Sequence, residues 1–123
     1  MKILNCLQAH KSLSSLSKNK MPLAVSFHVA RNVSELSPVV DDFHKERDKK
    51  ITELNSIEDK ESKEAMEMAK SFQKDLDELL DTEVEMNLHV IDLSKCKDLF
   101  IAPEDLVGCS DFITIGDANT DGW

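Results

Sequence analysis

The stretch EVEMNLHVIDL, residues 83–93, contains the pattern that decides the expected fold. Val84, Met86 and Leu88 alternate with polar residues, and Val90 continues the series. A period of two places successive side chains on opposite faces of an extended chain. We therefore predict a strand with one buried face and one solvent-facing face. The chain before it has mostly helical periodicity, and the chain after it favours short strands and one helical turn.

Two helices are predicted in the first third of the chain. The first covers about residues 5–19 and has an apolar stripe at helical spacing. The stripe consists of Cys6, Ala9, Leu13 and Leu16. The second begins at Pro22, because proline suits a first helical turn, and a break is expected at Asn32 or Ser34. Its apolar face is expected to hold Leu23, Phe27, Ala30 and Val33. Pro38 would then lie in the first turn of the next helix.

A long charged helix and a shorter one are predicted to form an antiparallel hairpin. The long helix ends near Leu54, and its inner positions keep roughly heptad spacing. Those positions are Leu36, Val40, Phe43, Arg47 and Leu54. Residues 55–61 are polar and would form the tip, and Ser62 is a suitable N-cap for a helix that ends near Leu80. The apolar stripe of this last helix is Ala65, Ala69, Phe72, Leu76 and Leu79.

Residues 103–108 favour a helical turn, and residues 112–115 favour a last short strand. Pairing that strand beside residues 83–93 would give a small sheet, which needs helices on one face because a lone hairpin is only marginally stable. We predict an α+β fold, in which a helical hairpin or bundle of three main helices packs on a small antiparallel sheet. Residues 1–115 are expected to form one domain, and residues 116–123 a flexible acidic tail.

The chain of 123 residues has a net charge of −9 that is unevenly distributed. Residues 1–40 contain five basic residues and one acidic residue, whereas residues 41–123 contain ten basic and 23 acidic residues. This excess of negative charge argues against nucleic-acid binding, because phosphate backbones are negative. No apolar run approaches the roughly 18 residues of a membrane span. Three cysteines without a framework spacing are typical of reduced thiols in a cytosol.

The best local motif for a metal lies at the end of the sequence. Asp117, Asn119 and Asp121 match the D-x-N-x-D-G start of a calcium loop, whose oxygen ligands occupy positions one, three and five. The sequence ends before the bidentate glutamate of position twelve, so we expect an acidic tail there. Cys6 and His10 would form half of a zinc site, but no second ligand pair accompanies them. We therefore predict no metal and no cofactor.

Four residues are candidates for ligand binding, and no catalytic set is predicted. Arg31 and Asn32 follow an apolar helical face, with His28 just before them. We expect Arg31 to cap carbonyls or to pair with an acid of the long helix, and anion binding is the alternative. His89 lies on the polar side of the expected strand near two carboxylates. A solvated histidine is expected there, and an acid–base group is the alternative.

Several short segments, taken in order and spacing, carry a resemblance to a known family. They are MPLAVSFHVARN (residues 21–32), Phe43 and Arg47, FQKDLDELL (residues 72–80), EVE (residues 83–85) and IAPEDL (residues 101–106). Over residues 1–113 the chain resembles small proteins of unknown function encoded by tailed bacteriophages. It departs from them in two places. The linker before the third helix is charged, where the resemblance leads us to expect a linker with glycine. The residues after Ile115 have no counterpart. The resemblance implies a viral protein inside a bacterium, in the host cytoplasm or in the virion, and supplies no catalytic residues.

These observations lead to three hypotheses about function. The first is a non-enzymatic phage interaction protein that associates with itself and acts in virion assembly or as a virion component. The second is an inhibitor that binds a host defence protein or a signalling ligand, where an acidic face would occupy a basic site. The third is a small hydrolase, which would require a deep pocket lined by Arg31, His28 and His89. The expected partners are copies of the chain itself, or another phage or host protein, and not nucleic acid or membrane.

Overall fold

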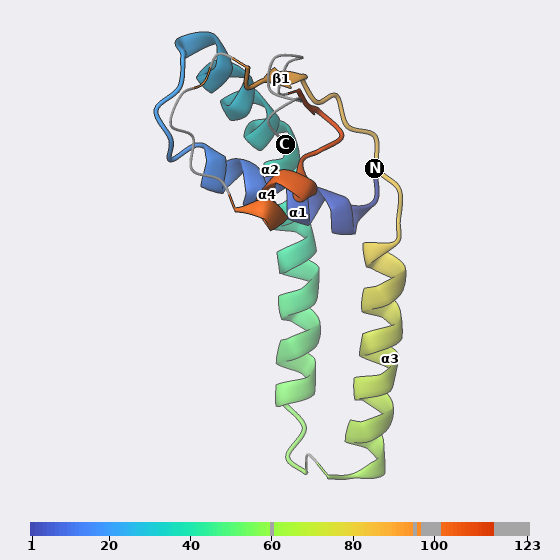
Figure 1. Cartoon of the computed structure of the whole chain (residues 1–123). Coiled ribbons are helices and arrows are strands. Elements are labelled where there is room, and N and C mark those ends of the chain that lie inside the picture. The colour runs from blue at the N-terminus through green and yellow to red at the C-terminus, as the bar shows by residue number, and fades with distance from the viewer. Residues whose placement is uncertain (60, 95, 97–101, 115–123) are drawn as a thin grey trace.

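The structure is a computed structural model that describes residues 1–59, 61–94, 96 and 102–114. Its elements are α1 (Ile3–Leu16), α2 (Leu23–Asn55), α3 (Lys63–Leu80), β1 (Ile91–Asp92), α4 (Pro103–Gly108) and β2 (Ile113–Thr114). Figure 1 shows two regions, a rounded head and a long helical hairpin that extends away from it. We call residues 1–43 and 81–114 the head, and residues 44–80 the stalk. The mostly helical chain with a small sheet agrees with the predicted fold at that level.

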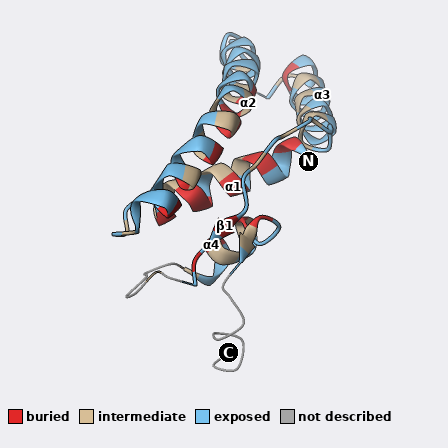
Figure 2. Cartoon of the chain, turned by 90° about the horizontal axis from the view of Figure 1, so that it is seen from above, coloured by how far each residue is buried: buried red, intermediate tan, exposed pale blue. Residues whose placement is uncertain are grey.

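The hydrophobic core lies in the head, between α1 and the first half of α2. The predicted stripe of α1 is completely buried: Cys6, Ala9, Leu13 and Leu16 all have 0% exposed surface. Val25, Val29 and Leu36 of α2 face it, and residues from the last part of the chain close the cluster. Those residues are Ile91, Leu93, Cys109 and Phe112. Figure 2 shows the buried residues concentrated on α1, the head half of α2 and the region around β1 and α4.

Helix α2 is one continuous helix, and the predicted break at Asn32 or Ser34 is wrong. Pro38 lies inside the helix and not in a first turn. Proline cannot donate the backbone hydrogen bond of its position, and its ring crowds the preceding turn, so it bends a helix that packing holds together. Figures 1 and 2 show α2 changing direction between the head and the stalk, and we attribute this bend to Pro38. The hydroxyl of Ser37 donates to the Val33 carbonyl over 2.8 Å, a bond that also favours bending.

The buried face of α2 in the head differs from the predicted one. Leu23 and Phe27 were expected to face the core, but they are 88% and 58% exposed. The buried residues are instead Val25, Val29, Asn32 and Leu36. This set also has helical spacing, but it lies on a different face of α2 from the predicted set. It includes a polar residue, Asn32, which the apolar pattern did not select. Packing against α1, and not the size of the apolar side chains, therefore decides which face of α2 is buried.

The sheet is parallel, so the predicted antiparallel pairing is wrong. Ile91 pairs with Ile113 and Asp92 pairs with Thr114 in a parallel register. The backbone N–H of Ile91 donates to the Phe112 carbonyl over 2.7 Å. The chain between the strands contains α4, and a helix in the connection is what allows a second strand to run in the same direction.

The strand predicted over residues 83–93 is present only at Ile91–Asp92, and residues 84–90 pair with no strand in the part of the chain that the structure describes. The predicted alternation is nevertheless present as far as Leu88, because Val84, Met86 and Leu88 are half-buried against the core while Glu85 and Asn87 are exposed. Val90, which was predicted to continue the buried face, is 61% exposed. The segment crosses the head as a strap. Its start is fixed by an isolated antiparallel bridge between Lys2 and Glu83, and its end continues into β1.

The stalk is the antiparallel hairpin of α2 and α3, and its local signals were predicted correctly. The Ser62 hydroxyl accepts a hydrogen bond from the Ala65 N–H over 3.1 Å and so caps α3. At its root, Phe43 is buried where the stalk joins the head. In α3 itself, Ala65 is the only buried residue. Among the described residues, no helix is both long enough and apolar enough to cross a membrane.

Candidate functional site: the open groove of the stalk

A groove follows one side of the stalk, between α2 and α3. It consists of two adjoining hollows of about 250 and 80 Å³, which share Lys50, Phe72 and Asp75 in their walls. The α2 wall contributes Glu46, Arg47, Lys50, Glu53 and Leu54, and the α3 wall contributes Met68, Ser71, Phe72, Asp75, Leu76 and Leu79. The long hairpin therefore has an incompletely filled seam.

The floor of the groove is the second half of the apolar stripe predicted for α3, because Ala65 and Ala69 of that stripe line neither hollow. Phe72, Leu76 and Leu79 are half-buried, so they lie under the groove without being covered by α2. The reason is in the facing helix, where the heptad positions after Phe43 are occupied by Arg47 and Lys50. Long cationic side chains cover apolar surface with their methylene stems but keep their charged ends in water, so they leave the seam open.

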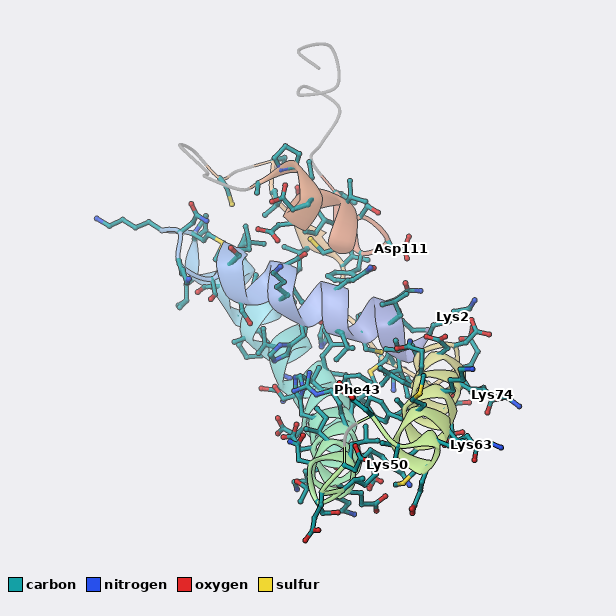
Figure 3. The ribbon with its side chains drawn as sticks, turned by 90° about the horizontal axis from the view of Figure 1, so that it is seen from below. Lys2, Phe43, Lys50, Lys63, Lys74 and Asp111 are labelled. Carbon is teal, nitrogen blue, oxygen red and sulfur yellow. The ribbon has the colours of Figure 1, made fainter. Side chains whose placement is uncertain are left out.

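The charges on the two walls are not paired with each other. Arg47 is 38% exposed and its guanidinium contacts Asp48 of the same helix at 3.4 Å, while its Nε atom is buried without a hydrogen-bond partner. Lys50 contacts Glu53 of the same helix at 3.5 Å. Asp75 on the α3 wall makes no ion pair with the described residues. Figure 3 looks along the stalk and shows Lys63 and Lys74 of α3 pointing outward, away from α2.

Asn32, predicted as a helix break and candidate binding residue, is a buried structural residue. It has 0% exposed surface, and its side chain holds the strap through two hydrogen bonds. The His89 N–H donates to Asn32 Oδ1 over 2.7 Å, and Asn32 Nδ2 donates to the His89 carbonyl over 2.8 Å. The side-chain amide thus replaces a neighbouring strand for one residue of the extended segment.

His28 and His89 lie together, whereas Arg31 does not join them in a site. The two imidazole rings are 5.3 Å apart between centroids at an interplanar angle of 35°. Arg31 is exposed, and the expected ion pair with an acid of the long helix is absent among the described residues. The stalk groove and a second hollow between α1 and α4 are lined by other residues, so neither is the pocket that the hydrolase hypothesis requires.

Neither of the two sets of candidate metal ligands forms a site in the part of the chain that the structure describes. Asp117, Asn119 and Asp121 lie outside the described residues. Cys6 is buried in the core, and burial raises the pKa of its thiol. His10 instead pairs with the Ser37 hydroxyl of α2, with its Nε2 atom at 3.2 Å. Within residues 1–59, 61–94, 96 and 102–114, no group of three or more His, Cys, Asp or Glu side chains is placed to hold a metal ion.

The hollow between α1 and α4 has a volume of about 480 Å³. Its walls include the buried side chains of Ser12 and Asp105 together with the exposed side chain of Lys11. Nearby, burial raises the pKa of the Cys109 thiol to about 11, and its sulfur donates a hydrogen bond to the Asp105 carbonyl over 3.1 Å. A thiol with so high a pKa is a weak nucleophile at neutral pH, so Cys109 serves packing.

Comparisons of this chain with protein-family models, with curated proteins and with solved structures found no match.

Proposed function

We propose that this chain is a non-enzymatic interaction protein that acts by associating with copies of itself, as a component of a larger assembly. The observation that carries the proposal is the half-exposed apolar stripe of α3 on a hairpin that extends away from the head. An extended hairpin with an incompletely covered apolar seam suits association between helices.

The size of this stripe indicates the strength of the contact it supports. Completing the burial of Phe72, Leu76 and Leu79 would contribute about 1 kcal/mol each, or about 6 kcal/mol for two copies. Association itself costs about 4 kcal/mol or more in lost translational and rotational freedom. The expected contact is therefore weak and reversible.

The uneven charge of the chain supports the same proposal. Residues 1–40 carry a net charge of +4 and residues 41–123 a net charge of −13. Opposite charges on different parts of one chain attract between copies, and this attraction is screened by salt. The resemblance to small tailed-phage proteins would make the assembly a viral one, with the chain acting in virion assembly or within the virion.

Sedimentation velocity over a concentration series tests the proposal. We expect the sedimentation coefficient to rise between about 10 μM and about 1 mM protein, with most of the rise near the upper end, because the apolar gain estimated above, less the cost of association, supports only weak affinity. The rise should be larger at low salt than at high salt. A chain that remains monomeric at about 1 mM and low salt would overturn the proposal.

A second candidate function, an inhibitor of a host protein, is favoured by the acidic tip of the stalk. Glu53, Glu58, Asp59, Glu61 and Glu64 are all exposed around the turn between α2 and α3. A protruding acidic tip suits insertion into a basic site. Affinity purification of the tagged chain from infected cells tests this candidate. It predicts one host protein at a fixed ratio, lost when Glu58 and Asp59 are replaced by lysine.

A further inference from the structure

We propose that the stalk groove receives the stalk of a second copy of this chain, so that two hairpins form a four-helix bundle around a two-fold axis. This inference rests on the proposed function and adds the surface and the arrangement. In the bundle, the α3 stripes of both copies share one interior. The groove would then no longer be open, because each copy covers the floor of the other.

The pattern of the seam favours a helical hairpin as the occupant. The groove floor contains Phe72, Leu76 and Leu79 at alternating spacings of four and three residues, the spacing with which helices pack side by side. The facing positions of α2, Arg47 and Lys50, do not fill that seam within one chain. A second copy supplies the apolar residues that α2 lacks, because its own α3 stripe is equally uncovered.

The wall charges favour a second copy over an unrelated helix, and they also select the axis. Arg47 and Lys50 lie on the α2 wall, at the same level of the stalk as Asp75 on the α3 wall. A two-fold axis parallel to the stalk lays the α2 wall of each copy over the α3 wall of the other. Arg47 and Lys50 of one copy would then meet Asp75 of the other, twice per dimer. The groove is therefore complementary to itself.

The available area agrees with a reversible dimer. Helix α3 has 18 residues and is about 27 Å long, and two helices side by side are about 20 Å wide. The face is thus on the order of 500 Å² per copy, or about 1,000 Å² for the pair. That total is at the lower limit for a specific protein interface. The apolar gain and the wall charge pairs together predict a weak dimer of roughly millimolar affinity, which the upper end of the concentration series described above would detect.

A pair of matched substitutions tests the location of the contact by sedimentation velocity. Leu76→Glu places a carboxylate in the groove floor, and we expect it to raise the dimer Kd by roughly 30-fold or more. Leu23→Glu makes the same chemical change at an 88% exposed position on the head, and its Kd should stay within about twofold of wild type. The inference is overturned if Leu76→Glu associates like wild type or if Leu23→Glu is the variant that loses association.

A charge exchange tests the arrangement with substitutions of a half-buried and an exposed wall residue, Arg47 and Asp75. Arg47→Glu and Asp75→Lys should each weaken the dimer by roughly tenfold, because each places like charges opposite each other. The double variant should bind more tightly than either single variant but less tightly than wild type, because Lys50 then faces a lysine at position 75. Circular dichroism is the control that checks whether the variants keep their helices. Additive losses in the double variant would overturn the proposed axis. A wild-type chain that never associates would overturn the proposed function itself, whereas association that ignores all groove variants would overturn only this inference.

Discussion

The head and the stalk are both built mainly from amphipathic helices, but they cover the apolar stripes of those helices to different extents. In the head, α1 buries its whole apolar stripe between α2 and the last segment of the chain. In the stalk, α3 has an equally regular stripe, but Ala65 is its only buried residue. The difference lies in what faces each stripe: Val25, Val29 and Leu36 face α1, whereas Arg47 and Lys50 face α3. An apolar stripe therefore predicts a helix, and only the facing element decides whether that stripe stabilises the fold or remains available for a partner.

The largest expected effect compares the same substitution in the two regions. Leu36→Ala removes a side chain with 0% exposure in the head, and it should lower the free energy of unfolding by about 3 kcal/mol. Leu76→Ala removes a half-buried side chain in the stalk and should cost about 1 kcal/mol in the monomer. Urea denaturation followed by circular dichroism at low protein concentration measures both. Equal losses would contradict the difference between head and stalk.

The second prediction concerns the residue that ties the strap to the head. Asn32→Ala leaves the backbone N–H and carbonyl of His89 without their partners, and it should cost about 2 to 3 kcal/mol in unfolding free energy. Asn87→Ala is the matched control, because Asn87 lies on the same strap with an exposed side chain, and its effect should stay within about 0.5 kcal/mol. If both variants were equally stable, Asn32 would not hold the strap.

The third prediction uses the Cys109 thiol of the head core. Burial raises its pKa from the ordinary value of 9.0 to about 11, so the folded state keeps a proton that the unfolded state releases. Stability from this group is complete below pH 9 and is lost as the pH rises through 11, by up to about 2 kcal/mol. Urea denaturation between pH 8 and pH 11 should therefore show a steeper loss for wild type than for Cys109→Ala. Parallel curves would contradict a buried, neutral thiol.

The smallest effect is expected for ion pairs on the outer faces of the stalk. Lys63 and Glu67 are 3.9 Å apart and largely exposed, and so are Lys49 and Glu46 at 3.1 Å. Replacing Lys63 by alanine should change the unfolding free energy by less than about 0.5 kcal/mol, because water and salt screen exposed pairs. A loss comparable to that of Leu36→Ala would mean that charges, and not packing, hold the stalk together.

The features that depend on local sequence could be predicted. The α1 stripe, the polar tip of the hairpin and the Ser62 cap all follow from residues within one or two turns of one another. The alternation was also predicted correctly as a burial pattern over residues 84–88, because it reflects one apolar side of the chain, but Val90, predicted to continue it, is 61% exposed. The open groove was not predicted, because periodicity identifies an apolar stripe without showing what covers it.

The features that depend on distant partners were predicted wrongly. Asn32 was interpreted as a break because its hydrogen-bond partner, His89, is 57 residues away. The parallel pairing of β1 and β2 depends on a connection through α4, which a strand pattern alone does not reveal. Pro38 was expected at a helix start, but packing of α2 on α1 keeps the helix continuous through it. These errors share one cause, which is that long-range packing overrides local propensity.

Hydrogen exchange of the wild-type chain at two protein concentrations, about 10 μM and about 1 mM, tests the central claim most directly. If the stalk groove is the self-association surface, the backbone amides of residues 68–79 should exchange more slowly at the higher concentration. The amides of α1 and of the head half of α2 should be unchanged, because their core is complete in one chain. Slower exchange confined to the head, or no change in the stalk despite self-association, would contradict the account.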